Sequence, residues 1–519
     1  MKNSPCVLTL DFGTQSVRAS LIDKNGEILH IVKEPYKPAY FSTQKGYAEQ
    51  DPDFYWNLAI QTMTQLVKEA SKDELDSIVG ATVTTFRDSS VQLDVDLKPI
   101  RPCILWLDQR MADAREKLPL MHKLAFKLVG MTNTIELNRK RTIAHWLKEN
   151  EPETWNKTYK YVNISTYLTY KLTGNLADSP SSMTGHYPIN YKKKVWYKEG
   201  ALKGRIFGVP NRMLPELKQP GEVLGVIKDE VAKQCGLPLG IKLIATGSDK
   251  ACETVGLGAL SRDVGAISYG TACTIEVSNQ KYHEPEKFLP AYAAAVQNWY
   301  NMDVQIYRGY WMLSWFSREF ATEAVNEAKI QAMAVEEVLN AKMSTIPPGS
   351  DGLVLQPYWG PGLSRPLAKG AIVGFSDVHT MTHLYRAIIE GIAYALKEGL
   401  ESIEKSQKHK IKSLMISGGG SQSDAICQIT SDIFGLPVSR VQTFETTSLG
   451  AAIATFVGLG EFENVEQAIS KMSRVSKTFY PDEKAQKQYE YLYKKVYVKM
   501  FPQLKDIYKD LKKYDKKEF

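Results

Sequence analysis

Two segments, one near the start and one near the middle of the chain, share the same succession of hydrophobic runs and polar turns. Residues 7–10 are a hydrophobic run of strand length, residues 17–22 are a second strand-length segment rich in hydrophobic positions, and the turn between them contains Gly13 and Thr14. Residues 264–268 and 274–277 flank a second turn that contains Gly270 and Thr271. Short hydrophobic runs bounded by such turns are typical of strands. The sequence therefore predicts two similar hairpins and, with them, two related lobes.

The remaining pattern predicts strands that alternate with helices. Strands are expected at 77–84, 104–106, 243–245 and 414–417, and helices near 53–71, 108–117, 121–128, 142–148, 381–404, 422–434 and 448–454. Residues 180–196 are polar and irregular, which indicates a surface segment. Tyr489, Tyr493, Tyr497 and Phe501 recur at helical spacing, which predicts the buried stripe of a closing helix. This order favours an α/β architecture with helices flanking the sheets.

Length and composition narrow the class of protein. At 519 residues the chain exceeds one ordinary core, so we expect two domains, 1–254 and 255–519. No run approaches the roughly 18 uninterrupted apolar residues of a membrane span, and the first residues lead into a strand without the apolar run of a signal peptide. The 6 cysteines form no C-x-x-C pair, which argues against a disulfide framework or a zinc site. A reduced, cytoplasmic protein is expected.

The net charge of +7 is modest for this length, and much of it lies between residues 505 and 517. Such a tail could bind nucleic acid, but a solvated helix face is the more common role of a short basic run. We therefore expect neither a nucleic-acid partner nor a membrane partner.

The first hairpin carries residues suited to a phosphate group. Its turn can present backbone N–H groups together with the side chains of Thr14, Gln15 and Ser16. Arg18 can add a charge-assisted contact, and Asp11 can hold Mg²⁺ through water, because Mg²⁺ loses its hydration shell reluctantly. A plain hairpin with a polar turn would use the same residues.

Two further strand ends also carry candidate chemistry. Gly418, Gly419 and Gly420 lie between a strand and a helix, where a helix N-terminus favours an anion or a flat ligand edge, although such loops can also be purely structural. Asp249 follows a buried strand at the start of a helix. It could cap that helix or act as a general base facing a cleft, and the two roles are compatible.

Arg87 and Asp88 follow another strand. At a strand end, a neighbouring arginine and aspartate can bind vicinal hydroxyls of a substrate through fixed donors and acceptors. A surface ion pair is the plainer interpretation of the same two residues when they are considered alone.

The order of the motifs resembles the FGGY family of carbohydrate kinases. Asp11-x-Gly-Thr is followed by Trp106-x-Asp108-x-Arg110, Gly247-x-Asp249, Gly270-Thr271, a segment from Gly370 to Glu390, Gly418-Gly-Gly-Ser and Leu449-Gly-Ala-Ala. The resemblance extends from about residue 6 to residue 500. It implies an α/β, two-lobed actin-like ATPase fold, related to ribonuclease H, with the nucleotide in the cleft between the domains. It also implies transfer of the γ-phosphoryl group of ATP to a hydroxyl of a sugar or polyol.

The resemblance implies a role for each matching residue. Asp11 would lie by Mg²⁺, and Asp249 would be the general base. The phosphates would be held by Thr14, Gln15, Ser16, Arg18, Gly270 and Thr271. The adenosine would be bordered by Gly419 and Ser423, with Gly418 and Gly420 shaping the loop. The substrate would contact Arg87, Asp88, Trp106, Asp249 and Lys250.

The identity of the sugar is less constrained. The Arg87-Asp88 segment is more similar to the Arg-Glu segment of glycerol kinases than to the Met-His segment of xylulokinases. The substrate tyrosine of glycerol kinases falls at about Asn138, however, and the glutamine after their catalytic aspartate is Lys250. Lys250 could contact a polar or acidic substrate, or it could be solvated on the first turn of its helix.

Three aromatic residues leave a similar choice. Tyr310, Trp311 and Trp315 could line the sugar pocket or belong to the core.

An actin-like or Hsp70-like ATPase that switches conformation is the alternative function, because it would share the hairpins and the glycine-rich turn. Arg87-Asp88 together with Trp106-x-Asp108-x-Arg110 favours a small-molecule kinase, since a switch ATPase needs no such pocket. The expected cofactors are ATP and Mg²⁺, and the expected partner is a small-molecule sugar or polyol, with a homodimer as one possible assembly.

Overall fold

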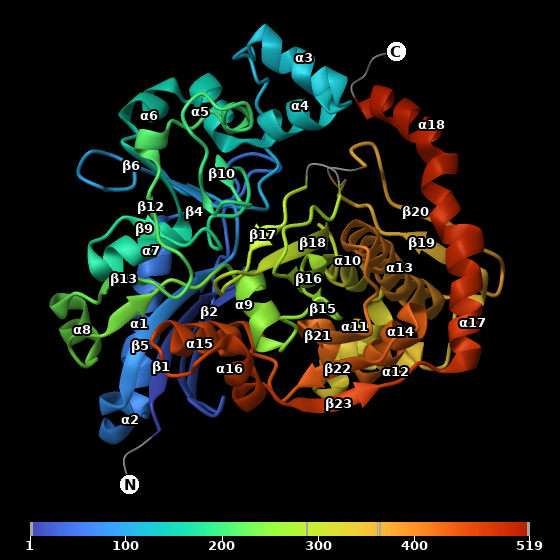
Figure 1. Cartoon of the computed structure of the whole chain (residues 1–519). Coiled ribbons are helices and arrows are strands. Elements are labelled where there is room, and N and C mark those ends of the chain that lie inside the picture. The colour runs from blue at the N-terminus through green and yellow to red at the C-terminus, as the bar shows by residue number, and fades with distance from the viewer. Residues whose placement is uncertain (1–3, 287–288, 361, 363–364, 516–519) are drawn as a thin grey trace.

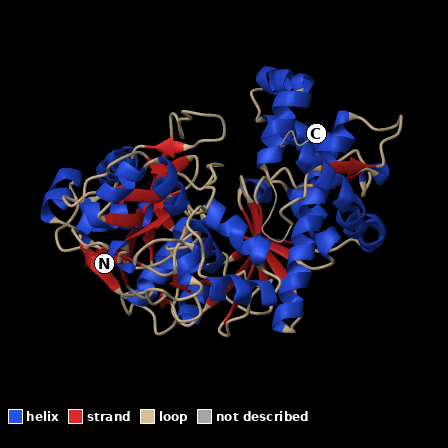
Figure 2. Cartoon of the chain, turned by 90° about the horizontal axis from the view of Figure 1, so that it is seen from above, coloured by secondary structure: helices blue, strands red, loops and turns tan. Residues whose placement is uncertain are grey.

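The computed structural model describes residues 4–286, 289–360, 362 and 365–515. Two large sheets occupy the centres of two lobes, and helices surround each of them (Figures 1 and 2). The first sheet has the order β13-β14-β5-β1-β2-β3, with bounds Val223–Val226, Lys242–Ile244, Ile78–Thr85, Cys6–Phe12, Ser16–Asp23 and Ile28–Pro35. The second has the order β17-β18-β16-β15-β21-β22-β23, with bounds Tyr292–Ala293, Tyr300–Ile306, Cys273–Asn279, Val264–Tyr269, Ser413–Ser417, Val438–Val441 and Val475–Phe479.

The two sheets repeat one topology. β1 pairs antiparallel with β2 to form the first predicted hairpin, and its other edge pairs parallel with β5. β15 does the same with β16 and β21. In each sheet, the central strand therefore ends at a glycine–threonine turn beside the carboxyl end of a parallel neighbour. The predicted hairpins, the two related lobes and the α/β class are confirmed.

Helices cover both faces of the first sheet. α1 (Pro52–Glu69) packs on β2 and β3, and α7 (Ile164–Thr173) packs on β5. α15 (Thr446–Gly458) comes from the far end of the sequence and packs on β1 and β5, with α16 (Val465–Met472) beside it (Figure 1). The C-terminal part of the chain thus supplies one layer of the first lobe. The predicted division at residue 254 would fall inside α9 (Asp249–Gly256) and stays a prediction.

The second sheet packs against α13 (Met381–Gln407), which lies beside α14 (Asp424–Phe434). The chain ends in α17 (Glu483–Leu492), a π-helical turn (Tyr493–Tyr497) and α18 (Val498–Asp515). Tyr489, Tyr493 and Tyr497 are buried around Tyr394, which confirms the predicted stripe, whereas Phe501 is only half-buried. None of the helices in the described part of the chain has the length and apolar character needed to cross a membrane.

Shorter elements complete the lobes. A four-stranded sheet of order β4-β7-β6-β8 joins Glu49–Gln50, Cys103–Ile104, Ser90–Leu93 and Lys160–Asn163. The further helices are α2 to α6 (Lys72–Asp76, Leu120–Leu128, Thr132–Arg141, Ile143–Asn150 and Pro152–Lys157), α8 (Asp229–Cys235) and α10 to α12 (Trp311–Phe320, Thr322–Gln331 and Val335–Met343).

α9 and α15 cross in close contact between the two sheets. A Cβ atom on Gly450 would lie 1.8 Å from the carbonyl oxygen of Cys252, and one on Gly256 would lie 1.9 Å from that of Thr446. Both distances are far below van der Waals contact, so only glycine permits this approach. The crossing fixes the helix that begins at Asp249 against the first sheet.

The predicted helix at 108–117 is wrong. Most of this stretch has no regular structure, because the side chain of Asp108 accepts hydrogen bonds from the backbone N–H of Arg110 at 2.8 Å and from that of Ala48 at 2.6 Å. The guanidinium of Arg110 then lies over the ring of Tyr47 at 3.9 Å and over that of Trp146 at 4.6 Å. A short acidic side chain that bonds the backbone two residues on competes with helix formation.

The predicted surface segment at 180–196 is also wrong. Met183 and Tyr187 are buried, and the hydroxyl of Ser181 donates to the carbonyl of Ala293 at 2.8 Å. The irregular backbone carries only the two-residue strands β10 (Ile189–Asn190) and β11 (Val195–Trp196). Its serine and threonine content, which suggested exposure, instead satisfies buried polar groups.

Candidate active site

The carboxyl ends of the central strands open into one cleft of about 2120 Å³ that residues of both lobes line. Every site residue predicted from the sequence lines this cleft: Asp11, Thr14, Gln15, Ser16, Arg18, Arg87, Asp88, Trp106, Asp249, Lys250, Gly270, Thr271, Gly418, Gly419, Gly420 and Ser423. Residues that are more than 400 positions apart in the sequence therefore share one site.

Asp11 and Arg18 stand opposite each other across the first hairpin. Arg18 Nη1 is 3.6 Å from Asp11 Oδ2, and Arg18 Nε is 2.6 Å from Glu445 Oε2. Burial raises the pKa of Asp11 to about 7, which Arg18 opposes and the carboxylates of Asp249 and Glu445 reinforce. Asp11 Oδ1 is buried and accepts no hydrogen bond among the described residues. A cation at this oxygen would relieve both the desolvation and the repulsion.

The donor set around Asp11 fits Mg²⁺ bound together with a nucleotide. No group of three or more His, Cys, Asp or Glu side chains in the described ranges could form a closed metal site. Mg²⁺ usually keeps several waters and is held by one or two carboxylates plus phosphate oxygens. Asp11 supplies one such carboxylate with a free oxygen.

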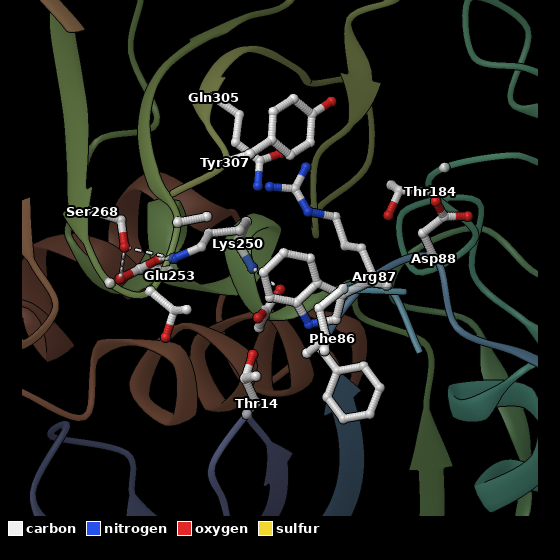
Figure 3. Close-up of a pocket in the computed structure, with 18 of the residues that line it drawn as sticks. Thr14, Phe86, Arg87, Asp88, Thr184, Lys250, Glu253, Ser268, Gln305 and Tyr307 are labelled. Carbon is white, nitrogen blue, oxygen red and sulfur yellow. Dashed lines mark hydrogen bonds and ion pairs between the residues drawn. The ribbon is translucent and has the colours of Figure 1, made fainter. Parts of the chain in front are cut away.

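The two glycine–threonine turns reach the cleft from opposite lobes. In the first, Gly13 N–H donates to the carbonyl of Ser16 at 3.0 Å, and Thr14 points into the cleft (Figure 3). In the second, the carbonyl of Gly270 accepts from the N–H of Tyr310 at 3.0 Å, which anchors the turn to α10. Thr14 and Thr271 both line the space between the lobes.

The glycine-rich turn packs against a pair of stacked tyrosines. The rings of Tyr269 and Tyr310 lie 4.8 Å apart at 10°. Gly418 has φ 80° and ψ 176°, a conformation that essentially only glycine adopts. A Cβ atom on Gly420 would lie 2.2 Å from the Tyr310 ring, whereas one on Gly419 would meet no atom within 4 Å. Gly419 therefore presents open, flat backbone to the cleft.

Asp249 begins α9 and is half-buried in the cleft. Burial raises its pKa, although the positive charges of Lys250 and Arg87 oppose the shift. The neighbouring Lys250 is not solvated, because its Nζ lies 2.7 Å from Glu253 Oε2 and 2.5 Å from Ser268 Oγ (Figure 3). The expectation of a solvated lysine is wrong.

Arg87 and Asp88 do not pair with each other, so the interpretation as a surface ion pair is also wrong. Arg87 Nη1 is 2.7 Å from Asp303 Oδ2 and its Nη2 is 3.8 Å from Glu276 Oε1. Burial lowers the pKa of Arg87, but Asp303 and Glu276 outweigh it and raise the pKa overall. Asp88 accepts from the backbone N–H of His186 at 2.9 Å and lies 2.6 Å from His186 Nδ1. Both side chains are thus fixed along the cleft wall.

The aromatic residues divide between the two expected roles. Tyr310 and Trp311 line the cleft, together with Trp106. Trp315 packs in the second lobe, with its ring 5.5 Å from that of Trp359 and 5.1 Å from that of Phe320.

Sequence reasoning missed several polar residues that hold these groups. Glu253 lies four residues after Asp249 on one helix, and this spacing places both on the same face, so the pattern could have revealed it. Glu276 and Asp303 are directly opposite each other on β16 and β18. Their joint contact with Arg87 depends on sheet register, which no local motif encodes.

Comparison with known proteins identifies the family. Residues 6–256 match the N-terminal domain of the FGGY family of carbohydrate kinases, and residues 265–459 match its C-terminal domain. The chain belongs to the FGGY family of carbohydrate kinases. This FGGY protein is thus a phosphotransferase that acts on a hydroxyl of a sugar or polyol, and a switch ATPase of the actin or Hsp70 type is not favoured.

Relatives of the FGGY protein match nearly its whole length. It is 29% identical to the xylulose kinase of Lactococcus lactis, over 94% of this chain and 95% of that relative. It is 25% identical to the gluconokinase of Bacillus subtilis, over 94% of each chain. The structure of xylulose kinase from Lactobacillus acidophilus superposes with a TM-score of 0.82 and 22% identity, over 98% of this chain and 100% of that one. This last likeness establishes the fold.

Proposed function

We propose that this FGGY kinase transfers the γ-phosphoryl group of ATP to a hydroxyl of a small sugar, sugar acid or polyol, with Asp249 as the general base. The observation that carries the proposal is the position of Asp249, which lies in one cleft with both phosphate-type turns and the glycine-rich turn. An alcohol is a weak nucleophile until its proton has an acceptor. The remaining demands of phosphoryl transfer are alignment and charge neutralisation.

Asp249 is suited to take that proton. Because burial raises its pKa, its carboxylate is a stronger base than an exposed aspartate. Lys250 and Arg87 oppose this shift, so the carboxylate stays ionised over a wider pH range. The backbone N–H of Lys250 donates to Asp249 Oδ1 at 2.8 Å. This bond fixes one carboxylate oxygen and leaves the other for the acceptor hydroxyl.

The nucleotide would lie between the turns of the two lobes. Thr14, Gln15 and Ser16 would hold its phosphates from one side, and Gly270 and Thr271 from the other. Mg²⁺ bound with the nucleotide would neutralise phosphate charge next to Asp11, while Arg18 would add a fixed positive charge. The open backbone at Gly419, and Ser423 at the start of α14, would border the adenosine.

The acceptor would lie along the wall formed by Arg87, Asp88 and Trp106. The guanidinium of Arg87 is held by Asp303 and can donate to vicinal hydroxyls or to a carboxylate. Relatives named xylulose kinase and gluconokinase support ketoses and sugar acids as the first acceptors to test.

A panel of ketoses, sugar acids and polyols, with ADP release measured by a coupled assay, tests this function. We expect at least one acceptor to raise ADP release well above the rate with ATP and Mg²⁺ alone. Asp249→Asn should lower kcat by roughly 10²- to 10⁴-fold, the usual contribution of a general base. The matched control is Asp263→Asn, because Asp263 pairs with Lys412 outside the cleft. Full turnover by Asp249→Asn would refute the base assignment.

A further inference from the structure

The ammonium of Lys250 has fewer acceptors in the described part of the chain than it has hydrogen-bond donors. A protonated lysine carries three N–H donors. Two of them meet Glu253 Oε2 at 2.7 Å and Ser268 Oγ at 2.5 Å, and no acceptor for the third is found among the described residues. The side chain is 19% exposed, and Lys250 lines the cleft. A ligand in the cleft can therefore accept the third N–H.

Glu253 holds this ammonium at a defined place. Its Oε1 accepts from the hydroxyls of Ser268 at 2.9 Å and Ser417 at 2.5 Å, while its Oε2 contacts Lys250. Burial alone would raise the pKa of Glu253, but Lys250 and the two serines lower it below its usual value, so the carboxylate is charged. Both the lysine and its partner are thus ionised inside the cleft wall.

The network lies directly beneath the two turns of the second lobe. Ser268 precedes the Gly270-Thr271 turn by two residues, and Ser417 is the last residue before Gly418. These serines are neighbours on the paired strands β15 and β21. Lys250 directly follows the base Asp249 on α9, and its ammonium is held by Glu253 and by Ser268 of the strand that leads into the second phosphate-type turn (Figure 3).

We propose that Lys250 is a second catalytic residue, which donates a hydrogen bond to the γ-phosphoryl group as that group passes from ATP to the acceptor. The proposal rests on the proposed function. In the step, a bond forms between the acceptor oxygen and the γ-phosphorus, and the bond from that phosphorus to the β–γ bridging oxygen breaks. ADP leaves with the electron pair, and the acceptor proton goes to Asp249. Lys250 keeps its protons and supplies a fixed positive charge.

Electrostatics favour this role over a purely structural ion pair. The equatorial oxygens of the transferred group carry negative charge throughout the reaction, and a preorganised donor in a low-dielectric site stabilises that charge. The lysine ammonium binds phosphate as a point charge, whereas the planar arginine guanidinium binds it in a fixed bidentate geometry. A point charge suits a phosphoryl group that moves during the reaction better. Arg18 stands on the opposite lobe, so the transferred group would have a cation on each side.

The test compares two nucleotides that differ by the γ-phosphate. Isothermal titration calorimetry with Mg²⁺ measures the affinities for ADP and for the β,γ-imido analogue of ATP. Lys250→Met should weaken the analogue by about 10-fold or more, as expected for a lost hydrogen bond to a charged group, and should change the affinity for ADP by less than about 3-fold. It should also lower kcat by roughly 10²- to 10³-fold.

Control variants separate catalysis from folding. Lys250→Met leaves Glu253 as a buried charge without its partner, which can destabilise the fold. The double variant Lys250→Met/Glu253→Gln removes both charges, so it should fold and still show the loss that is specific to the analogue. Lys250→Arg keeps the charge and should recover part of kcat. Lys194→Met removes a buried lysine that contacts the Tyr300 ring and does not line the cleft, so it should bind both nucleotides normally.

Four results have distinct meanings. If Lys250→Met lost as much affinity for ADP as for the analogue, the role of Lys250 would be overturned. Full kcat in the double variant Lys250→Met/Glu253→Gln would overturn it as well. A loss limited to the analogue in a protein that phosphorylates no acceptor would refute the proposed function and keep the contact with the γ-phosphate. If Lys194→Met also lost affinity for both nucleotides, the effect would be a general one on folding, and the support for Lys250 would likewise be removed.

Discussion

Alanine substitutions at the three consecutive glycines of the glycine-rich turn should have three different effects. Gly419→Ala adds a methyl group that meets no atom within 4 Å, so the fold should tolerate it. Gly420→Ala places a Cβ atom 2.2 Å from the Tyr310 ring and 2.8 Å from Tyr269 Cβ. Gly418→Ala puts alanine at φ 80° and ψ 176°, with its Cβ atom 2.5 Å from the backbone oxygen of Tyr269.

The magnitudes follow from these contacts. Overpacking of a buried site costs about 1–3 kcal/mol, which we expect for Gly420→Ala because two stacked rings must move. Gly418→Ala should cost at least as much, since the backbone region itself costs roughly 1–3 kcal/mol for a residue other than glycine and a backbone oxygen cannot rotate away. Gly419→Ala should be neutral, or stabilise by about 0.4–1 kcal/mol, because alanine restricts the unfolded chain.

Denaturant unfolding and nucleotide kinetics together test the series. Gly419→Ala should keep or slightly raise the denaturation midpoint. It should also raise the KM for ATP, by about 10-fold if the new methyl group costs about 1.4 kcal/mol of contact with the adenosine. The KM for the acceptor should not change, because Arg87 and Asp88 lie at a different part of the cleft. A destabilised Gly419→Ala, or one with a wild-type KM for ATP, would refute the placement of adenosine at this turn.

Three further predictions concern other parts of the protein. Gly450→Ala should destabilise the protein by about 1–3 kcal/mol, because its Cβ atom would lie 1.8 Å from the Cys252 oxygen, and an unchanged denaturation midpoint would contradict the close crossing of α9 and α15. Arg87→Met should raise the KM for the acceptor and leave the KM for ATP unchanged, and the opposite pattern in steady-state kinetics would remove Arg87 from the acceptor wall. Because burial raises the pKa of Asp249, kcat/KM should begin to fall with decreasing pH at a pH still above the usual aspartate pKa of about 3.9. A pH profile that stays flat down to that pH would contradict the assignment of Asp249 as the base.

The parts of the site that were predicted from the sequence are those that local pattern encodes. A hairpin turn, a glycine run between a strand and a helix, and an acid at a helix start each need only a few neighbouring residues. Gly13 and Thr14, Gly418 and Asp249 were therefore recognisable one by one. Their order along the chain then indicated the family, and the repeated topology of the two sheets confirmed the two lobes.

The errors came from residues whose structure depends on distant contacts. The local sequence around Asp108 predicts a polar helix. In the structure its side chain instead accepts hydrogen bonds from backbone N–H groups, including that of the distant Ala48. The local sequence around Ser181 predicts an exposed segment, but the Ser181 hydroxyl donates to the carbonyl of Ala293 in the other half of the chain. The partners of Arg87 are fixed by strand register, because Glu276 and Asp303 face each other only in the folded sheet.

The two hairpins differ in a way that explains the position of Lys250. Asp11 and Ser268 each precede the glycine of their turn by two residues. In the first lobe this position is acidic, and the cation beside it is Arg18, which the hairpin itself supplies on the paired strand. In the second lobe the position is a serine, and its hydroxyl holds Lys250, which comes from α9. Each turn therefore has a cation beside it, but the second lobe receives its cation from the helix that also carries the base. A displacement of α9 would move Asp249 and the positive charge at the second turn together, so the base and one of the phosphate contacts should be assembled in a single step.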